Sequence, residues 1–218
     1  EGFASGSYFF TEGESLHTFY IPKYAGVKPD TGESMWYTTN PETGAIETTT
    51  AYQQATYYTS GNAIADLYGG FNTSIAFFGV DVSASFTYQI GGLAYDSGYA
   101  GSMTSPVGTS VGMNMHKDLL NAWTPENPES NIPRLQYNDR YTAAVSDRFL
   151  TDASYLNIQN IQVGYTFPHK WTSKFGVHSL RVYLACDNVF YWSYRDGFDP
   201  RYSFTGSTNN ATYSPIRT

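Results

Sequence analysis

A strict alternation of apolar and polar side chains across residues 80–90 constrains the fold of this chain more than any other feature. The even-numbered positions are apolar, and the positions between them are Asp81, Ser83, Ser85, Thr87 and Gln89. Such period-2 alternation predicts a β-strand with one apolar and one polar face. Residues 71–77 alternate in the same way, and the Phe78-Gly79 junction between the two segments predicts a hairpin turn.

A second pair of strands is predicted over residues 154–167 and 178–192. In the first of these, Leu156 and Ile158 occupy even positions, whereas Ile161 and Val163 occupy odd ones. A one-residue slip would turn every later side chain to the wrong face, so the pattern predicts a β-bulge near residues 159–160. The alternative is that the first part of this strand projects beyond a membrane, where the alternation relaxes.

Two long stretches, residues 23–70 and 91–151, are rich in Gly, Pro, Ser, Thr and Asn and are expected to be irregular. Loops of this length are usually functional. Short turns at one end and long loops at the other are typical of outer-membrane barrels. The expected fold is therefore all-β, an antiparallel transmembrane β-barrel fragment with long extracellular loops. A soluble β-sandwich remains open, because alternation alone does not distinguish a lumen face from a solvent face.

Aromatic residues, which make up 17% of the chain, lie where these strands would end. One group closes the last strand and another flanks the turn before it: Phe190, Tyr191, Trp192 and Tyr194, then Tyr165, Phe167 and Trp171. Interfacial girdles of membrane barrels place aromatic rings at such depths. Ordinary cross-strand packing is the alternative explanation.

Charge and cysteine content exclude several classes of protein. A net charge of −7 is opposite to the basic footprint of a nucleic-acid-binding protein, so no nucleic acid is expected. The aromatic content excludes intrinsic disorder. The one cysteine, Cys186, excludes an intrachain disulfide and a Cys-based zinc site. It lies on the apolar face of the last predicted strand, where a packed, inert thiol is expected.

No catalytic constellation is found, so the chain is not expected to be an enzyme and no catalytic residue, metal or cofactor is assigned. The four histidines lack metal-ligand spacing: His17, His116, His169 and His178. The Asp30-Thr31-Gly32 triplet superficially matches an aspartic-protease signature. It follows Pro29, however, and Pro-Asp-Thr-Gly is a turn sequence.

Several moderately specific motifs occur along the chain from residue 12 to about residue 218. They are the run at 12–33, which contains Tyr-Ala-Gly-Val-Lys-Pro-Asp-Thr-Gly at 24–32, Gly-Gly-Phe-Asn-Thr-Ser at 69–74 with Phe-Gly-Val-Asp at 78–81, Trp-Thr-Pro-Glu-Asn-Pro at 123–128 with Ile-Pro-Arg at 132–134, Asp-Ala-Ser-Tyr-Leu-Asn-Ile-Gln-Asn-Ile-Gln-Val-Gly-Tyr-Thr-Phe-Pro at 152–168, Ser-Leu-Arg-Val-Tyr at 179–183 with Asp-Asn-Val-Phe at 187–190, and Gly-Phe-Asp-Pro at 197–200. Together, and in this order, they resemble one family, the SusC/RagA-type TonB-dependent transporters. The departures are modest: Lys28 and Arg201 stand where acidic residues are usual.

The resemblance implies an outer-membrane active transporter that imports glycans or peptides together with a SusD-like surface lipoprotein and is energised through TonB. Residues 1–218 would be the C-terminal portion of its β-barrel, with the plug domain and the barrel-closing strand absent. The turns at 78–79 and 168–177 would face the periplasm. Loops 23–70, 91–153 and 193–214 would face outward, and the strands would contact outer-membrane lipid. The alternative function is that of a soluble all-β carbohydrate-binding module.

Cargo contacts are expected from aromatic side chains in the loops and from the lumen face of the last strand. Tyrosine and tryptophan offer flat apolar faces with a hydrogen-bonding edge, which suit an oligosaccharide or a peptide equally. The candidates are Trp36, Tyr37, Tyr95, Tyr99 and Trp123 in the loops, and Arg181, Tyr183 and Asp187 on the strand. Arg181 and Asp187 are expected to form a charged wall of the pore. Packing within the loops is the alternative for each aromatic residue.

Overall fold

The computed structural model describes residues 2–105, 112–202 and 212–213, and most of its regular structure is antiparallel strand. The chain divides into two compact units. Unit 1 comprises residues 1–64, 92–152 and 197–218, and unit 2 comprises residues 65–91 and 153–196. Among the described residues, no helix has the length and apolar character needed to span a membrane.

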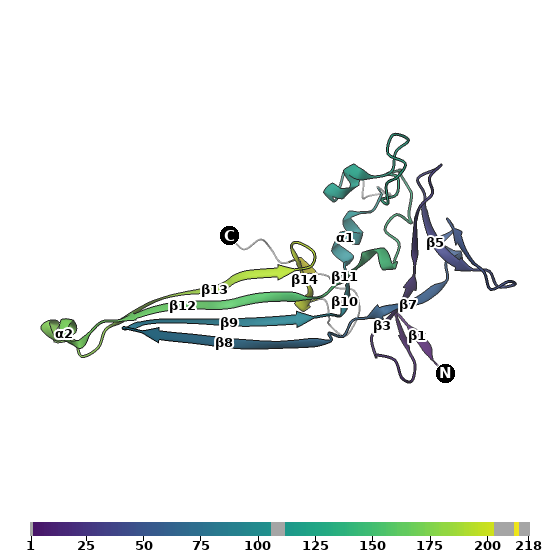
Figure 1. Ribbon diagram of the computed structural model, residues 1–218. Helices are drawn as coiled ribbons and strands as arrows, with labels where there is room; N and C mark the ends of the chain where they lie inside the picture. The colour runs from purple at the N-terminus through teal and green to yellow at the C-terminus, as the bar shows by residue number, and fades with distance from the viewer. Residues whose placement is uncertain (1, 106–111, 203–211, 214–218) are drawn as a thin grey trace. The chain divides into compact units, whose positions relative to one another are not determined.

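Unit 2 is a single antiparallel sheet in the order β13-β12-β9-β8 (Figure 1). Its strands are β8 (Leu67–Phe77), β9 (Val80–Ile90), β12 (Tyr155–Thr166) and β13 (Arg181–Ser193). The turn between β12 and β13 contains the helix α2 (His169–Thr172) and the 3₁₀ turn η5 (Ser173–Phe175). Strands of 11 to 13 residues are long enough to cross a bilayer at a tilt.

The hairpin between β8 and β9 turns on two residues, because Phe77 pairs with Val80. Both turn residues have positive φ, 49° at Phe78 and 85° at Gly79. Two positive φ angles in a two-residue loop match the right-handed twist of the flanking strands. A Cβ at Gly79 would lie 2.7 Å from the Thr166 carbonyl oxygen, so this position requires glycine. The predicted hairpin is therefore confirmed.

The predicted bulge is also confirmed. β12 shifts register between Ile158 and Asn160 against both of its neighbours. Ile158 pairs with Phe86 while Asn160 pairs with Ser85, so Gln159 is one extra residue relative to β9. The extra residue keeps the apolar side chains of β12 on one face of the sheet on both sides of the bulge.

All four strands direct their apolar side chains to the same face, which we call the apolar face. Cross-strand rows show this directly: Phe71 pairs with Phe86, and their rings stack with centroids 4.5 Å apart. These side chains are largely exposed, with Leu184 at 77% and Ile75 at 70%. Cys186 lies in the same face and is exposed, so the expectation of a packed thiol is wrong. The strand pattern placed it on the correct face, but no further layer of this chain covers that face among the described residues.

Unit 1 consists of short strands around a small aromatic core. One sheet has the order β1-β2-β3-β7 and another has the order β4-β5-β6. Two further pairs are formed by β10 with β11 and by β14 with β15. The strand bounds are β1 (Phe3–Ser5), β2 (Tyr8–Phe10), β3 (Thr18–Pro22), β4 (Tyr24–Val27), β5 (Ser34–Thr39), β6 (Ile46–Thr49), β7 (Tyr57–Asn62), β10 (Leu93–Tyr95), β11 (Leu150–Asp152), β14 (Phe198–Asp199) and β15 (Thr212–Tyr213). The helical turns are α1 (Ser97–Ser102), η1 (Tyr52–Gln54), η3 (Lys117–Asn121), η4 (Asp147–Phe149) and η6 (Pro200–Tyr202). The core consists of Phe19, Tyr95, Ala100, Met103 and Phe149.

The expectation that residues 23–70 and 91–151 are irregular is wrong in part, because these stretches contain strands β4 to β7, β10 and β11 and the helix α1. The strands are three to six residues long, apart from the start of β8 at Leu67. Alternation over so few residues is a weak signal, and β10 pairs with β11 from a distant part of the chain. Residues 203–211 of the predicted outer loop lie outside the described residues.

Candidate functional site: a polar and aromatic pocket in unit 1

Unit 1 contains an open pocket of about 420 Å³ between the β4–β5 region and a loop at residues 134–141. Charged and aromatic side chains line it together, which is the usual composition of a site that orients a polar ligand. The lining residues are Glu33, Ser34, Trp36, Thr50, Arg134, Gln136, Tyr137, Asn138, Asp139, Arg140 and Tyr141.

The turn that connects β4 to β5 forms one wall of the pocket. The Lys28 amide donates to the Glu33 carbonyl at 2.8 Å, and the Gly32 amide donates to the Lys28 carbonyl at 2.8 Å. Gly32 has a φ of 72°, and a Cβ there would lie 2.3 Å from the Trp123 ring. The position therefore needs glycine both for its left-handed backbone and for the close approach of Trp123. This geometry bears out the prediction that residues 29–32 form a turn.

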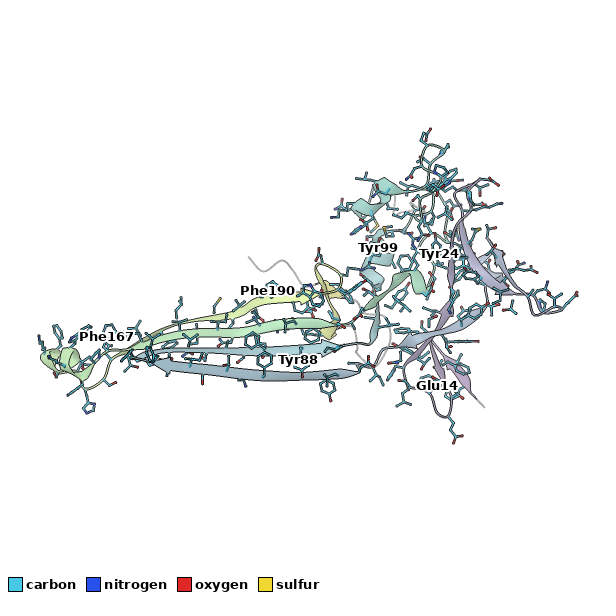
Figure 2. All side chains as sticks on the ribbon, in the orientation of Figure 1. Glu14, Tyr24, Tyr88, Tyr99, Phe167 and Phe190 are labelled. Atoms are coloured by element: carbon cyan, nitrogen blue, oxygen red, sulfur yellow. The ribbon has the colours of Figure 1, made fainter. Side chains whose placement is uncertain are left out.

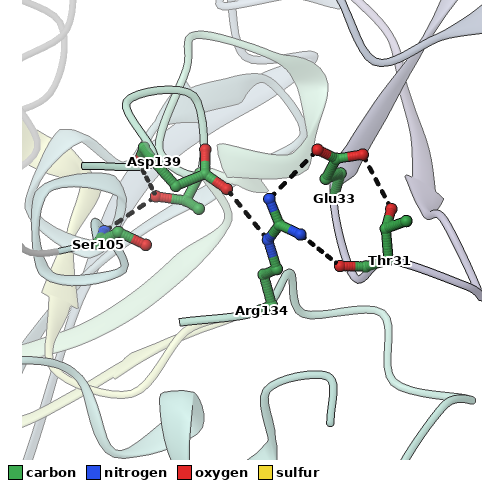
Figure 3. Close-up of polar contacts among 6 residues, drawn as sticks. Thr31, Glu33, Ser105, Arg134 and Asp139 are labelled. Carbon is green, nitrogen blue, oxygen red and sulfur yellow. Dashed lines mark hydrogen bonds and ion pairs between the residues drawn. The ribbon is translucent and has the colours of Figure 1, made fainter. Parts of the chain in front are cut away.

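Arg134 connects this turn to the loop on the other side of the pocket (Figure 3). Its guanidinium donates to the Thr31 carbonyl at 2.8 Å and to Glu33 Oε1 at 3.2 Å, and its Nε lies 3.7 Å from Asp139 Oδ2. The Thr31 hydroxyl donates to the second oxygen of Glu33 at 2.9 Å. One cation thus holds two carboxylates in fixed positions at the pocket wall, and the fork of guanidinium donors suits this bridging role.

Two aromatic residues of the lining, Trp36 and Tyr141, pack against Tyr52. The Trp36 and Tyr52 rings meet edge to face at 5.1 Å, and the Tyr52 and Tyr141 rings stack at 5.6 Å. Burial raises the pKa of the Tyr52 hydroxyl, which donates to the Val145 carbonyl at 2.9 Å. Trp36 is 2% exposed, and within the described residues its indole Nε1 has no hydrogen-bond partner. A buried indole donor of this kind can bind an acceptor oxygen.

A second buried polar group lies at the start of β4. The Tyr24 amide donates to Asp147 Oδ1 at 2.8 Å, and the Arg148 guanidinium lies over the Tyr24 ring at 5.1 Å. Burial raises the pKa of Tyr24 to about 12 and also raises the pKa of the Asp147 carboxyl. Burial lowers the pKa of Arg148. These contacts join η4 to β4 and so support the wall of the pocket.

The structure brings one loop candidate, Trp36, into the pocket and places the others elsewhere in unit 1. Tyr37 is 38% exposed, whereas Tyr95 lies in the core, where burial raises its pKa to about 12. The Tyr99 hydroxyl donates to Asp118 at 2.8 Å (its position is labelled in Figure 2). The Trp123 indole donates to the Pro29 carbonyl at 3.0 Å. Tyr95, Tyr99 and Trp123 thus all make packing or hydrogen-bond contacts within unit 1.

The strand candidates lie on the polar face of the unit 2 sheet, opposite the apolar face. Arg181 pairs with Asp81 on β9, with Nε 3.1 Å from Oδ1, and its guanidinium lies 5.3 Å from the Tyr183 ring. Asp187 instead accepts a hydrogen bond from the Asn160 side chain at 2.7 Å. Six residues of strand separate Arg181 from Asp187, or about 20 Å, so the two do not contact each other.

Gly164 on β12 allows the Arg181–Asp81 pair to form across the strand between them. A Cβ at Gly164 would lie 2.6 Å from Arg181 Nη2 and 2.7 Å from Asp81 Oδ1. The lack of a side chain on the central strand therefore leaves room for the ion pair. Sequence reasoning missed Asp81, because the pairing of β9 with β12 depends on a connection of more than sixty residues.

Sequence reasoning also missed most of the pocket. Arg134, Asp139 and Tyr141 are separated from Glu33 and Trp36 by about a hundred residues. The one available signal was the Ile-Pro-Arg motif at 132–134, whose arginine proves to be the bridging cation.

Comparison with known proteins shows what the chain is similar to. No protein-family model matches the chain. TonB-dependent receptor P3 of Formosa agariphila is 25% identical over 219 residues, covering 94% of this chain and 20% of that protein. TonB-dependent receptor P26 of the same organism is 25% identical over 146 residues, covering 67% of this chain and 14% of that protein. The chain spans about a fifth or less of the length of these relatives.

Solved structures give the same result. The structure of the RagAB peptide importer in the 'closed-closed' state matches with a TM-score of 0.71 and 27% identity, over 89% of this chain and 21% of that one. The 'open-open' state matches with a TM-score of 0.70 and 26% identity, over 89% of this chain and 20% of that one. The predicted resemblance to SusC/RagA-type TonB-dependent transporters is thus confirmed, as is the all-β antiparallel fold. These relatives are named as receptors and importers, so the expectation that the chain is not an enzyme is also confirmed.

Proposed function

We propose that residues 1–218 form the C-terminal portion of the β-barrel of a TonB-dependent outer-membrane transporter. The observation that carries this proposal is the apolar face of unit 2. Its side chains alternate with polar ones on either side of the bulge in β12, and most of the apolar set is exposed, whereas Asn157 on the polar face is 2% exposed. Each exposed apolar side chain costs about 25 cal/mol per Å² in water. No such cost arises when the face contacts lipid.

The ends of the sheet fit the same proposal. Tyr165 and Phe167 pack edge to face at 4.9 Å near the β12–β13 turn, and Phe190 and Trp192 lie toward the opposite end of β13 (Figure 2 labels Phe167 and Phe190). Aromatic side chains at both ends of an aliphatic band are the arrangement of barrel girdles. With the turns at 78–79 and 168–177 in the periplasm, the loops of unit 1 face the cell exterior.

The whole transporter would import glycans or peptides with a SusD-like surface lipoprotein, and TonB would supply the energy. The relatives named TonB-dependent receptor support the energy source, and the solved peptide importers support a peptide cargo. In unit 1, the pocket is the candidate cargo contact. Exposed Tyr137 and Tyr141 offer ring faces, buried Trp36 offers an indole N–H, and Arg134 fixes two carboxylates.

Uptake by cells that produce the full-length protein tests the cargo proposal. Tyr137→Ala removes a 65% exposed ring from the pocket, whereas Tyr194→Ala removes a 70% exposed ring from outside it. Loss of one stacking ring costs roughly 0.5–1.5 kcal/mol, so uptake of a limiting cargo should fall by a factor of about 2 to 13 in Tyr137→Ala only. Supplying labelled peptides and labelled oligosaccharides in parallel identifies the cargo class. Equal uptake by both variants would contradict the proposal that this pocket contacts the cargo.

A further inference from the structure

The turn between β12 and β13 contains an apolar pocket of about 330 Å³. Its walls carry no polar surface, and two of its aromatic side chains are strongly exposed, Phe175 at 83% and Trp171 at 56%. The lining residues are Phe167, Trp171, Thr172, Phe175, Val177 and Leu180. A cavity of this kind accepts an alkyl chain but no polar group.

The backbone around this pocket has a defined shape. The Val177 amide donates to the Thr172 carbonyl at 3.2 Å, and the Gly176 amide donates to the Ser173 carbonyl at 3.1 Å. With Gly176 in the left-handed region, at a φ of 68°, this is a Schellman motif. The motif brings Val177 back against the last helical turn, so the pocket is formed by local structure alone.

A pair of lysines lies beside the pocket on the same helical turn. Lys170 and Lys174 are four residues apart and each precedes one of the pocket aromatics, Trp171 and Phe175. Lys170 lies in α2 and Lys174 in η5, so both charges lie in the same short segment as the aromatic pair. Both lysines are exposed, and no ion pair found among the described residues includes either of them.

The charge of this segment is opposite to that of the whole chain. The net charge is −7, yet no Asp or Glu occurs from residue 153 to residue 186. Two histidines lie in the same segment, with His169 Nδ1 3.0 Å from the His178 carbonyl oxygen. The turn is thus a local cationic and apolar patch within an acidic protein.

We propose that this turn binds an anionic phospholipid, with one acyl chain in the apolar pocket and the phosphate group beside Lys170 and Lys174. The inference rests on the proposed function, because it needs a lipid-facing sheet. The pocket is continuous with that face: Leu180 lines the pocket, and Val182 and Leu184 follow on the same side of the chain. Lysines next to an apolar membrane surface attract anionic headgroups. The bound lipid would anchor the turn at the membrane boundary.

The test measures which phospholipid the full-length protein retains. The protein is reconstituted in vesicles of equal parts phosphatidylglycerol and phosphatidylethanolamine, re-extracted in detergent, and its retained lipid is quantified by mass spectrometry. Lys170→Gln/Lys174→Gln is compared with Lys28→Gln/Lys117→Gln, which removes two lysines from unit 1. The ratio of retained phosphatidylglycerol to phosphatidylethanolamine should fall about tenfold in the first variant and stay unchanged in the second.

Phe175→Ala tests the pocket separately from the charge. It removes an exposed side chain, so folding should be unaffected, and retention of both lipids should fall together. Equal retention of the two lipids by the unsubstituted protein, or an unchanged ratio in Lys170→Gln/Lys174→Gln, overturns the inference. The proposed function fails in a different way, namely if the full-length protein stays in solution without detergent and retains no lipid.

Discussion

Unit 1 and unit 2 contain the same types of apolar side chain but expose them to different extents. In unit 1, Phe149 and Phe198 are 1% and 0% exposed, as expected for a core formed in water. In unit 2, Phe77 and Leu184 are 69% and 77% exposed, although they lie in the most regular part of the sheet. Regular strands with exposed apolar side chains are what the proposed lipid-facing sheet requires, whereas unit 1 obeys the ordinary rule of burial.

The largest expected effect comes from the core of unit 1. Phe149→Ala deletes a ring that meets Tyr95 and Tyr99 edge to face at 6.1 Å, so the free energy of unfolding should fall by about 3–5 kcal/mol. The comparison variant is Phe190→Ala, whose ring is 51% exposed on the apolar face. Protease resistance of unit 1 in the full-length protein reports the loss. An equal loss of protease resistance in both variants would contradict the difference in side-chain burial between the two units.

The next effect concerns the apolar face itself. Cys186→Arg places a charge near the middle of the sheet on the apolar face, in the row of Ile161 and Ala84, and it should destabilise the protein in vesicles by about 2–4 kcal/mol. Ala185→Arg is the matched control, because the neighbouring side chain points to the polar face. Denaturant unfolding in phospholipid vesicles measures both. A penalty of the same size for Ala185→Arg would contradict the assignment of the faces.

A smaller, pH-dependent effect is expected at Asp147 in unit 1. Burial raises the pKa of this carboxyl in the folded state, so the native state binds its proton more tightly than the unfolded state. The tighter proton binding contributes its full amount to the free energy of unfolding below the unfolded pKa of about 3.9. This contribution is lost as the pH rises through the folded pKa.

Asp147→Asn retains an oxygen that can accept the Tyr24 amide but carries no titratable proton. The variant should therefore gain stability relative to the unsubstituted protein as the pH rises from about 4 to about 7. Melting temperatures across this range measure the difference, and Asp30→Asn controls for the loss of one exposed carboxylate. A difference that shrinks with rising pH would contradict the buried position of Asp147.

The smallest effect is expected on the polar face of unit 2. The Arg181–Asp81 pair is accessible to solvent, so Arg181→Ala should lower stability less than any of the changes above. A double-mutant cycle should show coupling of Arg181 with Asp81 and none with Asp187. The reverse pattern would contradict the observed pairing. Unchanged uptake in Arg181→Ala would also contradict the expectation that Arg181 and Asp187 form a charged wall of the pore.

Much of unit 2 could be predicted from the sequence, because long strands carry a repeated signal. The hairpin at Phe78-Gly79 and the bulge at Gln159 both follow from the phase of the alternation, which depends only on neighbouring residues. The pairing of Arg181 with Asp81 does not follow from the phase of the alternation. That contact depends on the register between β9 and β12, and no short turn connects those strands.

Unit 1 and its pocket were much less predictable. Its strands are too short to show a clear period, and Arg134 reaches Glu33 across 101 positions of the chain. The sequence predicts the aromatic residues of the loops as packing residues or cargo contacts, and only long-range folding separates Trp36, which lines the pocket, from Tyr95, which lies in the core.

The most direct test of the central claim uses Cys186, which lies on the apolar face and is exposed. A nitroxide spin label on Cys186 of the full-length protein in vesicles is compared with the same label in Ala185→Cys/Cys186→Ser, which moves the thiol to the polar face. Collision with oxygen reports lipid, and collision with a water-soluble nickel chelate reports water. In a lipid-facing sheet, collision with oxygen should dominate at residue 186 and collision with the chelate at residue 185. Equal access of the chelate to both positions would contradict a lipid-facing sheet.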